Sequence, residues 1–173
     1  PDARAWSNLA SVHYAQGNLR EAIRAYEEAV RLDANSGTTR RSLGDSRAKG
    51  GDSARARSDW RAAIELSRSA LRINPRDPRQ LKNLAICLAK LGEREEALRV
   101  SAQALESGPT VADTVYGAAV VHALLGDNQR ALVRLGDALE LGTSPALAER
   151  DDELAPLRAT PEFRALIAKA KIS

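Results

Sequence analysis

One spacing recurs along this chain and constrains its fold more than any other feature. Small or apolar residues return at intervals of 34, 41 and 34 positions in three separate columns. A period of 34 residues with small side chains at fixed points is typical of stacked helix-turn-helix repeats. Glycine permits the tight turn, and alanine lets paired helices approach to about 8–10 Å. The columns are Leu9, Leu43, Leu84 and Ala118; Gly17, Gly51, Gly92 and Gly126; and Ala22, Ala56, Ala97 and Ala131.

The first copy shows the repeating pattern most completely. Its apolar periodicity predicts helices over Ala3–Ala15 and Leu19–Leu32, with Gly17-Asn18 as the turn between them. Neither helix can bury its apolar stripe alone, so each copy needs neighbours of its own kind. We therefore expect one all-α domain over residues 1–173, with copies at about 3–36, 37–77, 78–111 and 112–145 and a capping segment over 146–173.

The second copy is seven residues longer than the others. The surplus is Ser67–Ile73, which contains no glycine or proline, so the helix from about Ser53 is expected to continue to Ile73. This adds roughly 10 Å of helix and should displace the third copy along the helix axis. The extension is interpreted either as a tolerated insertion or as a surface for a partner.

The later copies carry clear boundary signals. Asp77-Pro78 predicts an N-cap followed by proline at the first helical position, and Gly108-Pro109 ends the third copy. In the fourth copy, Tyr116 to Leu125 is unusually apolar for a helix expected to be exposed.

The 34-residue period is lost after Pro145. We expect a short helix over Pro145–Arg150, an acidic link over residues 151–153 and an apolar turn over residues 154–157. A last helix should begin at Thr160-Pro161 and end near Lys171, covering the final apolar face of the array with Lys169 and Lys171 outward.

The first copy resembles the tetratricopeptide repeat family. The matching residues are Trp6, Leu9, Tyr14, Gly17, Ala22, Tyr26 and Ala29, and the likeness covers about residues 3–145. Ala34 stands where the family often has proline, which Pro75 and Pro109 keep in later copies. The resemblance implies a right-handed α-α superhelix of four repeats that acts as a protein-interaction scaffold. The tail LAPLRATPEF also resembles the ends of repeat arrays in multidomain bacterial regulators.

Composition narrows the classes of function. Aromatic residues make up only 3% of the chain, which suits close-packed helices better than a β-sandwich or barrel. The formal net charge is +3, and the excess lies in residues 1–77, which carry 14 Lys/Arg against 10 Asp/Glu. The arginines are scattered at helical spacing, whereas nucleic-acid binding requires a denser basic patch. No apolar run is long enough to predict membrane insertion.

No arrangement of residues points to catalysis, a cofactor or a metal site. His13 and His122 stand in one repeat column three copies apart and are interpreted as partly buried packing residues. Cys87, the only cysteine, lies among apolar residues and has no histidine near it in sequence, so it is interpreted as a core residue. Asp151, Asp152 and Glu153 are expected to cap a helix or to lie in water. We therefore predict that the segment is not an enzyme.

By resemblance to the family, the first helix of each copy lines a concave groove. The basic and polar residues at one end and the apolar residues at the other predict a peptide partner with acidic groups and an apolar anchor. A chaperone-type carboxylate clamp is disfavoured, because Ser7, Ser11, Ser42 and Asn83 replace its residues and only Arg79 keeps the required charge. The expected groove residues are Arg4, Ser7, Ser11, Tyr14, Arg41, Asp45, Lys49, Arg79, Lys82, Ile86, Lys90, Tyr116 and Val120.

Two alternatives stay open on the sequence. The chain can instead be a structural or homo-oligomerisation element that uses its convex face and the long second-copy helix. It can also be an accessory domain of a bacterial signalling enzyme whose catalytic part lies outside these residues. A single cysteine says little about compartment, and we favour the cytoplasm over the periplasm.

Overall fold

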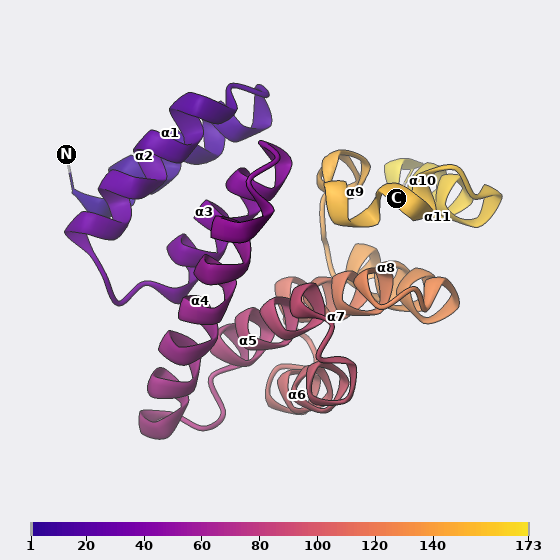
Figure 1. The fold of residues 1–173 in the computed structure, drawn as a ribbon. Helices are drawn as coiled ribbons and strands as arrows, with labels where there is room; N and C mark the ends of the chain where they lie inside the picture. The colour runs from indigo at the N-terminus through magenta and orange to yellow at the C-terminus, as the bar shows by residue number, and fades with distance from the viewer. Residues whose placement is uncertain (1, 173) are drawn as a thin grey trace. The chain divides into compact units, whose positions relative to one another are not determined.

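The computed structural model describes residues 2–172, and helices are the only regular structure in that range. The residues form two compact parts: an N-terminal part that ends at Ile73, the last residue of the long second-copy helix, and a C-terminal part that begins at Asn74. Each part contains two helical hairpins (Figure 1). The all-α helix-turn-helix architecture predicted from the repeat period is therefore confirmed.

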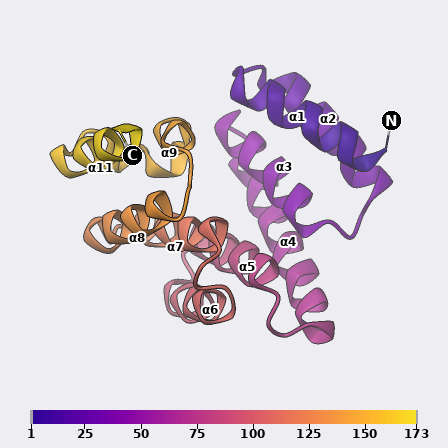
Figure 2. The same ribbon diagram turned by 180° about the vertical axis from the view of Figure 1, so that it is seen from behind.

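The N-terminal part consists of α1 (Ala3–Ala15), α2 (Leu19–Leu32), α3 (Gly37–Lys49) and α4 (Ser53–Ile73). The helices pair as α1 with α2 and α3 with α4, and α2 packs against α3 (Figures 1 and 2). The predicted bounds of α1 and α2 are confirmed, and α4 continues to Ile73 without a break.

The C-terminal part begins with α5 (Pro78–Leu91), α6 (Arg94–Ser107), α7 (Ala112–Leu124) and α8 (Asn128–Glu140). The helices pair as α5 with α6 and α7 with α8, and α7 packs against both α5 and α6. As predicted, Asp77 caps α5, because its carboxylate accepts hydrogen bonds from the backbone N–H groups of Arg79 and Gln80.

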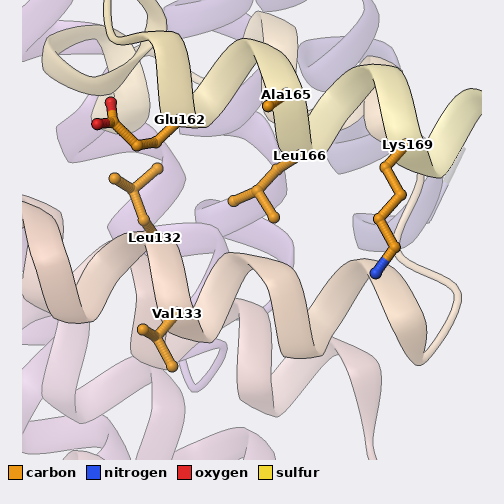
Figure 3. Close-up of a pocket in the computed structure, with 6 residues that line it drawn as sticks. All are labelled: Leu132, Val133, Glu162, Ala165, Leu166 and Lys169. Atoms are coloured by element: carbon orange, nitrogen blue, oxygen red, sulfur yellow. The ribbon is translucent and has the colours of Figure 1, made fainter.

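The chain then forms α9 (Pro145–Arg150), a 3₁₀ turn η1 (Asp152–Leu154), α10 (Ala155–Arg158) and α11 (Pro161–Ile172). The expected short helix and last helix are both present, whereas the expected apolar turn is partly helical. Helix α11 packs on α8 and α9, and its Lys169 and Lys171 side chains pair with Glu140 and Glu149 at the surface. An open hollow of about 390 Å³ lies beside this contact, between α11 and α8, and its lining includes Leu132, Val133 and Leu166 (Figure 3).

The repeat columns explain how each hairpin closes. The turn glycines have φ values between 76° and 88°, a left-handed conformation that favours glycine. The alanine column (Ala22, Ala56, Ala97 and Ala131) has no solvent exposure in any copy, as its role in helix pairing requires. At Gly44 the contact is closer still, since an added Cβ would lie 2.7 Å from the Nε1 atom of Trp60 on α4.

The leucine column reports how hairpins stack. Leu43 of α3 is fully buried against Ala10, Ala25 and Tyr26, which all belong to the preceding hairpin. Leu9 occupies the same column position in α1, has no hairpin before it in the described chain and is 43% exposed. Within the N-terminal part, the column residue of the second hairpin is therefore buried by the hairpin that precedes it.

A buried ion cluster, which the sequence did not reveal, joins three helices of the N-terminal part. Asp59 of α4 is 3% exposed and accepts from two α3 guanidinium groups, that of Arg47 at 2.6 Å and that of Arg40 at 3.3 Å. Arg47 also donates to Glu27 of α2 at 2.7 Å. A buried carboxylate needs such partners, because burying it alone is very costly.

Candidate partner-binding surfaces

The first surface lies on the first helices of the N-terminal part. Its residues are spaced three or four positions apart, so each set occupies one face of its helix. We call it the α1/α3 surface; it consists of Arg4, Ser7, Ser11 and Tyr14 on α1 and Arg41, Asp45 and Lys49 on α3.

Two contacts fix the shape of the α1/α3 surface. The ammonium group of Lys49 lies 4.6 Å from the centre of the Tyr14 ring, which joins α3 to α1 through a cation–π contact. The Ser11 hydroxyl lies 2.9 Å from the hydroxyl of the buried Tyr26 and donates to the backbone oxygen of Ser7. Ser11 is exposed, and its hydroxyl joins α1 to α2 of the same hairpin.

The charge of this surface is positive. Asp45, its one carboxylate, accepts a hydrogen bond from the Trp60 indole at 2.9 Å and lies 3.8 Å from the guanidinium of Arg41. Arg4 and Lys49 are exposed, and Arg41 is half-buried. The surface thus carries three cations and one anion that already has internal partners.

The second surface lies on α5 and α7, the first helices of the C-terminal part. Arg79 is exposed at the start of α5. Lys82 pairs with Asp113, and its aliphatic stem packs so closely on Gly117 that an added Cβ would lie 2.3 Å from it. Lys82 is therefore a packing residue as well as a cation.

The remaining expected groove residues are covered. Ile86 and Val120 are buried, and Tyr116 is only 8% exposed. The expectation that α7 is an exposed helix is wrong, because α5, α6, α8 and the 3₁₀ turn η1 all pack on it. Its apolar residues, which surround the whole helix, are buried on nearly every side.

The cover is a stretch of the same chain, residues 151–157. Asp151 accepts a hydrogen bond from the Tyr116 hydroxyl at 2.7 Å, and Glu153 forms an ion pair with Lys90. Leu154 and Leu157 have no solvent exposure. Burial and the neighbouring Asp151 carboxylate raise the pKa of Tyr116 above its usual range, which keeps the phenol protonated as a donor.

The cysteine and the two histidines, which were considered as catalytic or metal-binding residues, lie in packed surroundings. Cys87 is fully buried in α5, as predicted. His13 and His122 are half-buried, as predicted. Burial lowers the pKa of His122, although the nearby Asp127 opposes that effect. Across residues 2–172, no group of His, Cys, Asp and Glu side chains is arranged to hold a metal ion.

The fold defines a class: an α-helical repeat protein built from helical hairpins that recur at about 34 residues. Two tetratricopeptide repeat profiles match the sequence, one over residues 2–76 and one over residues 54–113. The chain belongs to the tetratricopeptide repeat family, and the resemblance read from the first copy is confirmed.

Solved structures include one with the same fold along the whole chain. TTC0263, described as a thermophilic TPR protein in Thermus thermophilus, matches 99% of this chain and 100% of its own, with 23% identity and a TM-score of 0.57. MamA 41-end from Desulfovibrio magneticus RS-1 matches 98% of this chain and 91% of its own, with 17% identity and a TM-score of 0.49. No curated protein matches the sequence significantly. None of the helices in residues 2–172 is long and apolar enough to cross a membrane.

Proposed function

We propose that this chain is a non-catalytic interaction scaffold whose α1/α3 surface binds an acidic segment of a partner protein. The observation that carries the proposal is the charge of that surface, on which Arg4, Arg41 and Lys49 stand beside a single carboxylate. Membership of a family of protein-binding repeats supports the general role.

The chemistry of these side chains favours a carboxylate-bearing peptide. A guanidinium can form paired hydrogen bonds with one carboxylate, and a lysine ammonium adds a second positive centre. Tyr14 supplies a rigid aromatic contact at low entropic cost, and its position is held by Lys49. A segment with two or more acidic residues would complement these groups along α1 and α3.

Charge reversal tests the proposal. The probe is a fluorescein-labelled peptide of about ten residues that alternates glutamate with alanine, followed by fluorescence anisotropy at low salt. We expect Arg4→Glu/Lys49→Glu to weaken its binding about tenfold, since two attractive contacts become repulsive.

A matched control separates local contact from overall charge. Arg20→Glu/Arg24→Glu changes the net charge equally, at two exposed positions on α2. This control should weaken binding by less than about threefold, because its charges lie outside the α1/α3 surface. Equal weakening by both double variants, or no weakening by the first, would place acidic-segment binding elsewhere.

A further inference from the structure

Residues 151–157 lie on α5 and α7 in the way that a bound peptide would. The side chain of Asp151 reaches Tyr116 on α7, and that of Glu153 reaches Lys90 on α5. Arg158 adds one contact from within the tail, donating to the backbone oxygen of Asp151 at 2.5 Å. Two anionic side chains thus meet one cation and one phenol donor on the repeat helices.

The apolar half of the segment follows directly. Leu154 and Leu157 are three positions apart and fully buried, and the turn that contains Leu154 packs on α7. The α5/α7 surface therefore offers polar partners for two carboxylates and, on α7, an apolar contact for Leu154, whereas Leu157 lies on α10, which packs on η1 and α11. The complement of this surface is a peptide in which acidic residues precede a leucine, and the sequence DDEL has that pattern.

The segment is attached in a way that permits release. It follows Gly142, whose φ of 98° ends the hairpin of α7 and α8. Helix α9, which precedes the segment, has six residues, and α10, which begins inside it, has four. Helices of this length are not stable alone, so contacts with α5, α7 and α11 hold the segment in place. In Figures 1 and 2 the tail lies beside the hairpin of α7 and α8.

We propose that the α5/α7 surface is a second docking site, for a partner peptide with carboxylates followed by a leucine, and that residues 151–154 occupy this site until such a peptide displaces them. The proposal extends the scaffold role to another surface and does not depend on the α1/α3 surface. The polar partners Lys90 and Tyr116, together with the buried Leu154, identify the occupant.

The tether determines how strongly a partner must bind. A segment joined by a short flexible link acts at an effective concentration on the order of millimolar. A free peptide with the same contacts therefore binds the wild-type chain weakly, since the site is open for only a small fraction of the time. Weakening the internal contacts should raise the affinity for the free peptide by the same factor that opens the site.

The experiment uses the whole chain and a labelled peptide that copies residues 150–159, RDDELAPLRA. We expect Asp151→Asn/Glu153→Gln to bind this peptide about tenfold more tightly than wild type, because the internal segment loses its charged contacts while the probe keeps its own. Adding Lys90→Gln to that variant should remove most of the gain. A probe in which the leucine equivalent to Leu154 is changed to serine should not bind.

Two controls keep the outcome decisive. Glu140→Gln/Glu149→Gln makes the same charge change at exposed ion pairs to α11 and should bind the probe as wild type does. If the double variant at Asp151 and Glu153 does not fold, Asp151→Asn alone should give a smaller gain in the same direction. Equal affinity in wild type and the opened variant, or a gain that survives Lys90→Gln, would overturn the proposal. Its failure leaves the α1/α3 proposal standing, since the two tests share no residue.

Discussion

Among single substitutions of polar residues, replacement of Asp59 should destabilise the N-terminal part most. Replacing it by alanine leaves the Arg40 and Arg47 guanidinium groups close together without their shared carboxylate. Breaking a buried ion pair in this way costs about 3–5 kcal/mol. The two arginine side chains are 29% and 15% exposed, and Arg47 keeps Glu27, so we expect about 2–3 kcal/mol.

Urea denaturation followed by tryptophan fluorescence measures this loss directly. Both tryptophans, Trp6 and Trp60, lie in the N-terminal part, so the signal reports its unfolding. Urea is uncharged and leaves ion pairs unscreened, and the midpoint should fall by about 1–2 M. Glu27→Gln is the control, because Glu27 is half exposed and should cost less than about 1 kcal/mol. If Asp59→Ala costs no more than Glu27→Gln, the cluster does not stabilise the fold.

Two further predictions concern packing and pH. Gly44→Ala should lower the free energy of unfolding by about 1–3 kcal/mol, since its Cβ would overlap the facing indole. Gly136→Ala meets only an ordinary 3.4 Å contact and should be neutral or stabilising; equal effects in urea titrations followed by circular dichroism, which reports the helices of both parts, would contradict the close contact. The lowered pKa of His122 means that the unfolded chain binds its proton more readily, so stability should fall as pH drops from about 7 through 6.5 and level off below the folded pKa. His122→Leu should lose that part of the pH dependence, and parallel stability–pH curves for the variant and wild type would refute it.

The helices themselves were predictable because the repeat imposes the same local solution several times. Gly17 and its column mark the turns, and Asp77-Pro78 combines an N-cap with a proline suited to the first helical position. The long α4 helix followed from the absence of glycine or proline in its extra residues. Each of these signals is formed by residues that are close together in the chain, so it can be recognised from one sequence alone.

Burial of the fourth copy was not predictable by the same reasoning. The repeat pattern places Tyr116 and Val120 on a first helix, which the family resemblance assigns to a groove. Whether that groove is covered depends on residues 151–157, which belong to no repeat. The sequence did contain a usable signal, because a helix that is apolar all round is usually a buried one.

The same point changes one expectation about mutants. The family resemblance assigns Tyr116 to a groove, where replacing a residue typically affects binding with little change in melting temperature. The structure gives Tyr116 a hydrogen bond to Asp151 and nearly complete burial, so its loss should also destabilise the C-terminal part. Arg79 is exposed, so its replacement should change the melting temperature little.

The leucine column gives the array a direction. Leu43 of the second hairpin is buried against the first hairpin, whereas the side chain of Leu9 is exposed to solvent. Deleting the first hairpin would expose Leu43 to solvent. Placing another hairpin before Ala3 would bury Leu9. An engineer who lengthens or shortens the N-terminal part therefore needs a polar residue at this column position in whichever hairpin comes first.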